Sequence, residues 1–453
     1  MQVRKTNIKN MLTQKHRVLI VGLGKTGLSC ARYLSAQGIE VAITDSREKP
    51  PELARLHAEL PHVAVFTGGF EQQVFASADE LIVSPGVSLK HPFIRQAIEQ
   101  GKKIIGDVEL FAQHVTAPSI VITGSNGKST VTSLVGIMAR EAGKQVRVGG
   151  NIGKPVLELI EEHEPDCYVL ELSSFQLEYT HSLNASVATV LNVSEDHMDR
   201  YDDFQEYIDA KQRVFRGNGI MVLNRDDEHV MAMAEPVRKI ITFGLQAAEA
   251  NQYGLSEYQG EWWLSRGDKR LLNRNELLIP GMHNVANALA ALAIGEAAGF
   301  SQSAMLAALR GFQGLPHRSQ FVLEEDGVRW YNDSKGTNVG ATEAALSGLD
   351  GKVVLIAGGE GKGADFSDLV PAVKAKARAV VLIGKDARLI ADALAGLCEI
   401  VFAEDMEDAV NKARLLAHNG DAVLLSPACA SFDMFDGFEH RGDVFMQIVR
   451  RVA

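Results

Sequence analysis

Cysteine is scarce in this sequence and scattered along it. The four cysteines, Cys30, Cys167, Cys398 and Cys429, are far apart and form no Cys-X-X-Cys pair. This spacing excludes a disulfide framework and a zinc site of the usual kind. We therefore expect a reducing compartment, the cytoplasm, in which each cysteine is a small core residue rather than a nucleophile.

An excess of basic residues is also missing. The sequence has 57 acidic against 46 basic side chains, a formal net charge of −11. Such a charge repels nucleic-acid backbones and anionic lipid surfaces, so we expect no nucleic-acid partner. An anionic ligand must then be held locally, by backbone N–H groups, Lys, Arg or a metal ion in particular loops.

The sequence contains no long hydrophobic run near its start. The first fifteen residues carry Arg4, Lys5, Lys9 and Lys15 but lead only into the short apolar run 18–21. This pattern fits neither a signal peptide nor a membrane span, so no membrane insertion is expected. Residues 1–10 are left out of the predicted fold because the patterned sequence begins after them.

The chain does contain a regular alternation of strand-like and helical segments. Its 453 residues exceed one ordinary hydrophobic core and suggest about three domains. Alternating segments of this kind are typical of parallel sheets covered by helices. The strand-like runs are residues 17–21, 40–44, 81–83, 120–122, 168–170, 189–191, 221–223, 353–356, 380–383 and 422–425.

We predict an α/β protein of three domains. Breaks in the pattern near Gly106 and in the glycine- and proline-containing segment 311–316 give domains 1–106, 107–314 and 315–453. The first is expected to be Rossmann-like, the second to hold a parallel sheet of the P-loop ATPase type, and the third to be Rossmann-like again. Segment 253–270 has a less regular pattern, which favours an antiparallel insertion.

The sharpest motif is GSNGKST at 124–130, between a β-branched strand and the helical run 131–142. Glycines let successive N–H groups converge on phosphate oxygens, and the helix N-terminus adds a favourable field. Lys128 supplies positive charge, and Ser129 can reach a magnesium ion. Only two residues separate the glycines where four are usual, but the order of strand, loop and helix favours a phosphate site over a chance turn.

A second glycine motif, GLGKTG at 22–27, follows a strand, opens a helix, and precedes Asp45 by 18 residues counted from Gly27. This is a dinucleotide-binding fingerprint, and an NAD-dependent dehydrogenase is the obvious alternative. The fingerprint specifies only a pyrophosphate at a helix N-terminus, which a UDP-sugar also carries. A chain with both this motif and a phosphate-transfer loop fits a ligase better than a dehydrogenase.

The shortened loop at 124–130 resembles that of the Mur ligase and folylpolyglutamate synthetase superfamily. Further segments match in order between Gly22 and Arg441, and they narrow the resemblance to Mur ligases that add D-glutamate. These segments are GGNIG at 149–153, ELSSFQL at 171–177, EDHMDR at 195–200, LPHR at 315–318, NDSK at 332–335 and SPACAS at 426–431.

The resemblance implies an ATP-dependent acid–amino-acid ligase of peptidoglycan precursor synthesis, and through it a part in cell-wall biogenesis, cell shape and cell division. The implied reaction adds D-glutamate to UDP-N-acetylmuramoyl-L-alanine through an acyl phosphate. ATP and two magnesium ions are the implied cofactors, and the protein is expected to be a monomer. Another Mur-type or folylpolyglutamate-type amide ligase, and the dehydrogenase, stay open as alternatives, whereas a non-enzymatic scaffold leaves the metal candidates unexplained.

The candidate metal residues gain their roles from the resemblance. From the residues alone, Glu171 is a helix cap or surface carboxylate, His197 lies in an acidic turn, and Lys211 is a surface lysine on an amphipathic helix. The resemblance implies that Lys211 is carbamylated and so becomes an anionic ligand for magnesium. The implied catalytic residues are Lys128, Glu171, His197 and Lys211, and the implied metal site consists of Ser129, Glu171, His197 and Lys211.

The remaining candidate contacts are also implied by the resemblance. ATP contacts are expected from Gly124, Ser125, Asn126, Gly127, Lys128, Ser129, Thr130, Asn287, Arg318 and Asp333. Contacts to the UDP-linked substrate are expected from Gly24, Thr26, Gly27, Asp45, Ser46, Arg47, Ser84, Pro85, Gly86 and Asn151. D-Glutamate contacts are expected from Lys335, Thr337, Lys362, Ser431, Phe432 and Phe438.

Plainer readings of several of these residues stay open at this point. Asn287 opens a helical run and is equally a helix cap. Arg318 and Asp333 are equally partners in surface ion pairs. The glycine-rich segment 358–363 is equally a flexible turn.

Overall fold

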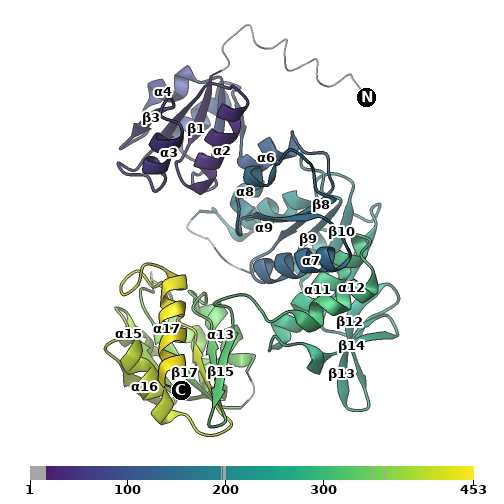
Figure 1. Ribbon diagram of the computed structural model, residues 1–453, viewed down its shortest axis with the longest axis vertical. Helices are drawn as coiled ribbons and strands as arrows, with labels where there is room; N and C mark the ends of the chain where they lie inside the picture. Colours follow the sequence, from purple (N-terminus) through teal and green to yellow (C-terminus); the bar gives the residue numbers. More distant parts are fainter. Residues whose placement is uncertain (1–16, 195, 197–199, 350, 362, 453) are drawn as a thin grey trace. The chain divides into compact units, whose positions relative to one another are not determined.

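The structure is a computed structural model that describes residues 17–194, 196, 200–349, 351–361 and 363–452. These residues form three separate β-sheets with helices packed on them, as Figure 1 shows. This confirms the predicted α/β class. The chain groups into two compact units, and the first unit contains the first sheet and most of the second. The proposed domain boundaries stay predictions.

The first sheet has the strand order β3-β2-β1-β4-β5, and its neighbouring strands are parallel. Cores on both faces hold it in place, because one set of side chains packs under α2 and α3 and the opposite set under α4 and α5. The elements are β1 (Val18–Val21), α2 (Lys25–Ala36), β2 (Val41–Asp45), α3 (Leu53–Glu59), β3 (Ala64–Thr67), α4 (Gln72–Ser77), β4 (Glu80–Val83), α5 (Pro92–Glu99) and β5 (Lys103–Ile105).

The second sheet has nine strands in the order β14-β13-β12-β11-β10-β9-β6-β8-β7. The segment predicted to be an insertion forms β12 to β14 at one edge of this sheet. Its strands are β6 (Ser119–Thr123), β7 (Val146–Gly150), β8 (Cys167–Glu171), β9 (Val187–Val190), β10 (Ile220–Asn224), β11 (Ile240–Phe243), β12 (Gln252–Tyr258), β13 (Glu261–Arg266) and β14 (Lys269–Asn273). Its central strands β8, β6 and β9 are parallel neighbours, so their carboxyl ends share one edge.

The helices that accompany the second sheet position the candidate site. α7 packs on β7 and β8, and its Gly136 allows close contact with Val148, because a Cβ at this glycine would lie 2.7 Å from a Val148 methyl group. The helices are α6 (Asp107–Ala112), α7 (Lys128–Glu141), η1 (Val156–Leu159), α8 (Ser174–Glu178), α9 (Phe204–Gln212), η2 (Arg213–Phe215), α10 (Glu228–Ala232), η3 (Arg274–Glu276), α11 (Met282–Ala297) and α12 (Gln302–Gly311).

The first two sheets share a continuous core. Side chains under α2, such as Leu28 and Leu34, belong to the same buried cluster as Val108 of α6 and Leu157 of η1. An ion pair of 2.9 Å between Arg32 of α2 and Glu158 of η1 lies beside this core. The first sheet is therefore packed directly onto the second domain's helices.

The third sheet has the order β15-β16-β20-β17-β18-β19, with β15 antiparallel and the other strands parallel. α16 and α17 pack over one face of it, while α13, α14 and α15 pack over the other (Figure 1). The elements are β15 (Gln320–Glu325), β16 (Val328–Asn332), α13 (Val339–Ser347), β17 (Val353–Gly358), η4 (Phe366–Leu369), α14 (Val370–Lys376), β18 (Ala377–Ile383), α15 (Ala387–Ala393), β19 (Glu399–Phe402), α16 (Met406–Leu416), β20 (Ala422–Leu425) and α17 (Phe438–Val452).

No helix among the described residues is both long enough and apolar enough to cross a bilayer.

Candidate active site

The glycine loop at 124–127 connects β6 to α7, as predicted, and its backbone requires glycine. Gly124 has φ +148° and Gly127, the residue before α7, has φ +81°, values that side-chain-bearing residues rarely adopt. α7 begins at Lys128, three residues earlier than the sequence pattern indicated, so Lys128, Ser129 and Thr130 form its first turn. The first-turn N–H groups of a helix point outward and attract anions.

The loop is held in shape by the segment that follows β9. The N–H groups of Ser125 and Asn126 donate to the backbone oxygen and side-chain oxygen of Asn192, at 2.9 and 2.8 Å. Asn192 Nδ2 donates in return to the Asn126 carbonyl at 3.1 Å, and the Ser194 N–H donates to Ser125 Oγ at 3.0 Å. Asn192 was not among the predicted residues, because only the neighbouring positions of β9 and β6 reveal its role.

Two lysines converge on this loop. Lys128 Nζ donates to the carbonyls of Gly124 and Ser125 at 2.7 and 2.9 Å, and Lys211 Nζ donates to the same Gly124 carbonyl at 3.0 Å. Lys211 is only 2% exposed, so the reading of it as a surface lysine is wrong. Burial, reinforced by the positive charge of Lys128, holds the pKa of Lys211 well below its usual value.

Tyr207 of α9 connects Lys211 to the glycine loop. The Lys211 amine lies 4.3 Å from the centre of the Tyr207 ring, and the Tyr207 hydroxyl is 3.0 Å from Ser125 Oγ. Burial raises the pKa of Tyr207 to about 12, so its hydroxyl keeps its proton at neutral pH. The side chain of Lys211 is thus packed against a neutral aromatic ring, and the negative charge of Asp196 only partly opposes the lowering of its pKa.

Glu171 lies at the carboxyl end of β8, next to the strand that leads into the glycine loop. It is 2% exposed, and the following helix α8 is capped by Ser173, so Glu171 is neither a surface carboxylate nor a helix cap. Asn151 Nδ2 donates to Glu171 Oε1 at 2.8 Å, whereas Oε2 is buried and has no hydrogen-bond partner among the described residues. A buried, unpaired carboxylate oxygen is a suitable ligand for a cation.

The described residues fit a magnesium ion at this edge of the sheet. They contain no cluster of three His, Cys, Asp or Glu side chains able to hold a metal. Magnesium needs no such cluster, because it takes oxygen ligands, keeps several waters and shares ligands with phosphates. Glu171 Oε2 and the hydroxyl of Ser129 are oxygen donors of the required kind, and a carbamylated Lys211 would add another. His197, the remaining metal candidate, lies outside the described residues.

The first-domain candidates lie at the carboxyl ends of β1, β2 and β4. Strand order changes direction between β1 and β4, which is where open α/β sheets bind ligands. A Cβ at Gly27 would lie 2.0 Å from the Gly22 carbonyl oxygen, so this close approach of helix and loop needs glycine. Ser84 Oγ donates to the same carbonyl at 2.9 Å, joining the turn 84–87 to the glycine loop.

Asp45 is buried beside this loop and fully engaged by neighbouring groups. Its carboxylate accepts from the Leu23 N–H at 2.7 Å and from the Arg47 guanidinium at 2.6 Å. Burial alone would raise the pKa of Asp45, but hydrogen bonds from Arg47 and from the Leu23 backbone outweigh it and leave the pKa below its usual value. Asp45 therefore fixes the loop and Arg47, while the side chain of Arg47 stays about half exposed.

The third-domain candidates follow three adjacent strands of the second unit: β16, β20 and β17. Their loops are joined by a hydrogen bond of 2.9 Å from the Ala428 N–H to the Gly336 carbonyl, and by paired 3.0 Å bonds between Glu360 and Ala430. This pairing means that segment 358–361 is not merely a flexible turn. Lys335 Nζ lies 5.0 Å from the centre of the Phe438 ring. Ser431 is buried and Phe432 is exposed, whereas Lys362 lies outside the described residues.

Asp333 is buried rather than part of a surface ion pair. It accepts from Ser426 Oγ at 2.7 Å and from the Ser319 N–H at 2.9 Å. Burial raises its pKa to about 6 despite these hydrogen bonds. Asn287 lies within α11 and donates to the Asn284 side chain at 3.2 Å, so it does not cap the helix start.

These features define a class of protein. A glycine loop at a helix N-terminus, two converging lysines and a buried carboxylate at the next strand end are the features that a site for a nucleoside triphosphate requires. A Rossmann-like sheet packed onto the same domain carries a second glycine loop at a helix N-terminus. The molecule is an α/β enzyme that couples nucleotide phosphoryl transfer to chemistry on a further substrate.

Comparison with known proteins then identifies the family. Residues 16–106 match the N-terminal domain of MurD-like Mur ligases, residues 122–295 the Mur ligase middle domain, and residues 317–429 the Mur ligase glutamate ligase domain. The chain belongs to the Mur ligase family. It is an ATP-dependent ligase of cell-wall synthesis, and the nicotinamide dehydrogenase alternative is thereby ruled out.

Relatives with curated names cover almost the whole chain. It is 54% identical to the UDP-N-acetylmuramoylalanine–D-glutamate ligase of Nitrosococcus oceani, over 96% of each chain. It is 51% identical to the ligase of that name from Pseudomonas aeruginosa, over 98% of this chain and 100% of the other.

Solved structures confirm the fold at lower identity. The UDP-N-acetylmuramate–alanine ligase of Thermotoga maritima superposes with a TM-score of 0.61 at 20% identity, over 96% of this chain and 100% of the other. FolC of Escherichia coli, solved in complex with DHPP and ADP, superposes with a TM-score of 0.58 at 18% identity, over 77% of this chain and 94% of the other.

Proposed function

We propose that this chain joins D-glutamate to the L-alanyl carboxylate of UDP-N-acetylmuramoyl-L-alanine, with hydrolysis of ATP to ADP and phosphate. The observation on which this depends most is the convergence of Lys128, Lys211 and Glu171 around the glycine loop, because an ATP-driven ligation needs a phosphoryl-transfer site. The names of the relatives at 54% and 51% identity support the choice of substrates.

In the first step the alanyl carboxylate oxygen attacks the γ-phosphorus of ATP. The bond from that phosphorus to the β–γ bridging oxygen breaks, giving an acyl phosphate and ADP. The N–H groups at the start of α7 and Lys128 hold the phosphates and offset the charge that spreads over the transferring group. Magnesium, when bound at Glu171 and Ser129, supplies further neutralisation of that charge.

In the second step the neutral amine of D-glutamate attacks the acyl carbon. The carbon–oxygen bond to phosphate breaks, inorganic phosphate leaves, and the attacking nitrogen loses a proton to give the amide. The third-domain loops with Lys335, Thr337, Ser431, Phe432 and Phe438 are proposed to hold the side-chain carboxylate of D-glutamate. A lysine with hydroxyl and amide donors is what a free carboxylate requires.

We also propose that Lys211 acts as a carbamate. A neutral lysine amine attacks carbon dioxide, forms a carbon–nitrogen bond and releases a proton, which leaves an anionic carboxylate in place of a cation. The lowered pKa of Lys211 supports this step, because only the neutral amine is nucleophilic. The conversion would also remove the repulsion between Lys211 and Lys128.

The remaining assignments belong to the same proposal. The loops at 22–27 and 84–86, with Asp45, Ser46, Arg47 and Asn151, would bind the UDP-linked substrate, and Asn287, Arg318 and Asp333 would contact ATP. The enzyme would work in the cytoplasm and as a monomer.

Phosphate release by the purified full-length chain tests the proposal. ATP, magnesium and UDP-N-acetylmuramoyl-L-alanine are combined in turn with D-glutamate, L-glutamate, D-alanine or L-lysine, and a reduced folate with L-glutamate serves as the folylpolyglutamate arm. We expect release with D-glutamate, and at least about 100-fold less with the other amino acids and in the folate arm. Equal or faster release in another arm would contradict the choice of substrates.

A further inference from the structure

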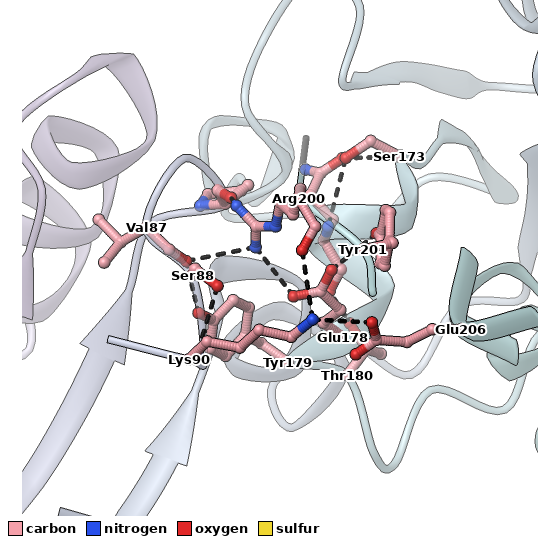
Figure 2. Close-up of polar contacts among 12 residues, drawn as sticks. Val87, Ser88, Lys90, Ser173, Glu178, Tyr179, Thr180, Arg200, Tyr201 and Glu206 are labelled. Atoms are coloured by element: carbon pink, nitrogen blue, oxygen red, sulfur yellow. Dashed lines mark hydrogen bonds and ion pairs between the residues drawn. The ribbon is translucent and has the colours of Figure 1, made fainter. Parts of the chain in front are cut away.

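Arg200 lies between the turn that follows β4 and the helices around the phosphate site, and its role is not part of the substrate contacts proposed above. Its guanidinium donates to the Pro85 carbonyl at 2.8 Å and to the Val87 carbonyl at 3.3 Å. It also pairs with Glu178, the last residue of α8, at 2.8 Å. Figure 2 shows Arg200 reaching both the turn and the helix.

The turn is closed by its own hydrogen bond and is bonded to the first glycine loop. The Val87 N–H donates to the Ser84 carbonyl at 2.9 Å, which closes a β-turn over residues 84–87. On one side, Ser84 Oγ is bonded to Gly22 of that loop. On the other side, both carbonyls that point outward, those of Pro85 and Val87, accept from Arg200. Arg200 therefore sets the orientation of the peptide planes in the turn.

The Arg200–Glu178 pair is almost buried. Each side chain is 10% exposed, the Arg200 guanidinium carbon lies 4.1 Å from the centre of the Phe175 ring, and the Tyr201 hydroxyl donates to Glu178 at 2.7 Å. Breaking a buried ion pair leaves an uncompensated charge, so this contact resists distortion. Phe175 and Glu178 both belong to α8, which begins three residues after Glu171. The turn is thereby fixed to the segment that positions the candidate metal ligand.

Two further contacts join the same segments (Figure 2). The Tyr179 hydroxyl donates to the Val87 carbonyl at 2.6 Å. Lys90, just beyond the turn, pairs with Glu206 at 2.8 Å, and Glu206 lies on α9, the helix that carries Lys211. The turn that forms part of the candidate UDP site is therefore connected to α9, which carries Lys211, and to α8, which follows Glu171 in the chain.

We propose that Arg200, assisted by Tyr179, is a positioning residue that couples occupancy of the UDP-substrate turn to the geometry of the phosphate site. This inference rests on the proposed function, which assigns the two sites. Substrate that orders the turn would also order α8 and Glu171, so the UDP-linked substrate and the ATP–magnesium complex would each tighten binding of the other. Such coupling is reciprocal, because it is one free energy shared by two sites.

Calorimetric titration of the full-length chain measures the coupling without turnover. A non-hydrolysable ATP analogue with magnesium is titrated with and without UDP-N-acetylmuramoyl-L-alanine, and the reverse titration is done as well. We expect the wild-type protein to bind each ligand at least about fivefold more tightly when the other is present. Arg200→Ala should reduce this factor to near one, Tyr179→Phe should reduce it partly, and Arg200→Lys should fall between Arg200→Ala and the wild type.

Arg213 provides a matched control. Its guanidinium donates to the backbone carbonyl of the same Glu178 at 2.7 Å, and this contact stays within the second domain. Arg213→Ala should therefore keep the coupling factor of the wild type. In steady-state assays Arg200→Ala should raise the KM for the UDP-linked substrate by about tenfold or more. The melting temperature should fall less in Tyr179→Phe than in Arg200→Ala.

The outcomes separate this inference from the proposed function. A wild-type chain that releases no phosphate with D-glutamate overturns the proposed function. An active wild type that shows no coupling overturns the inference alone. The inference is also overturned if Arg200→Ala and Tyr179→Phe keep the full coupling factor of the wild type. An equal loss of coupling in Arg213→Ala would overturn it too, because a purely structural role would then account for Arg200.

Discussion

Lys128 and Lys211 donate to one and the same acceptor, the backbone carbonyl of Gly124, at 2.7 and 3.0 Å. Two ammonium groups in contact with a single carbonyl repel one another, and one of them is buried. The arrangement favours a neutral amine at Lys211, and it is this relationship that makes the carbamate physically reasonable.

Carbamylation of Lys211 can be observed directly. Protein incubated with ¹³C-labelled bicarbonate should show one carbamate carbon resonance by NMR, and Lys211→Met should lack it, because Met keeps the side-chain volume without the amine. The same variant should lose at least about 100-fold in phosphate release, since a loss of this order follows removal of a charged transition-state contact. An identical spectrum from the Met variant would refute the assignment.

Glu171 should govern metal affinity. Glu171→Gln keeps an acceptor for Asn151 but removes the negative charge, so binding of Mn²⁺ in the presence of ADP, followed by electron paramagnetic resonance, should weaken by about tenfold or more. Asn151→Ala frees the Oε1 oxygen of Glu171 and should weaken Mn²⁺ binding by only a few-fold. Glu164→Gln, which changes an exposed carboxylate that bonds Thr116, serves as the control. Unchanged Mn²⁺ affinity in Glu171→Gln would exclude this ligand.

Gly27 tests the first glycine loop. A Cβ at this position would lie 2.0 Å from the Gly22 carbonyl, so Gly27→Ala must push α2 away from the loop. We expect it to abolish measurable UDP binding and to lower the free energy of unfolding by about 1–3 kcal/mol. Gly24→Ala provides a comparison for folding stability, because a Cβ there meets nothing within 4 Å. Similar stability losses in both variants would count against the close-approach argument.

Asp107 should make stability depend on pH. It is buried at the start of α6, and burial raises its pKa to about 6 against the opposing backbone N–H of Val108 and the side chain of Gln176. At pH values between the pKa of Asp107 in the unfolded chain and its pKa of about 6 in the folded protein, the folded state binds the proton more tightly. The contribution of Asp107 to stability is therefore present at low pH and is lost as the pH rises.

Asp107→Asn removes that dependence. At pH 7 the free energy of unfolding of the variant should exceed that of the wild type by up to about 3 kcal/mol, which corresponds to a shift of about two pKa units. This difference should disappear near pH 4. Urea unfolding of both proteins across this range measures it. A difference that stays constant with pH would mean that Asp107 titrates normally in the folded protein.

Local patterns predicted much of this architecture. The strand before Gly124, the helix after Gly127 and the position of Glu171 at a strand end all follow from short stretches of sequence, because period and glycine placement are local properties. The roles of Asn192 and Arg200 could not be predicted this way. They depend on β9 lying next to β6 and on the turn after β4 reaching α8, which are consequences of packing between distant segments.

The burial of Lys211 shows the same limit. Its helix carries enough polar residues to suggest an exposed face, and nothing in residues 204–212 indicates that this lysine points inward. The Tyr207 ring and the Gly124 carbonyl, 87 positions away from Lys211, create its environment. Resemblance to known ligases, rather than periodicity, selected it.

The most direct test of the account is a crystal structure of the full-length chain with a non-hydrolysable ATP analogue and magnesium, collected for the wild type and for Lys128→Ala. We predict that the terminal phosphates lie against the N–H groups of residues 127–130 at the start of α7 in the wild type, beside a metal on Glu171. This density should be lost in the variant while the fold is kept. Nucleotide bound in another cleft, with the loop at 124–130 free of phosphate, would contradict the account.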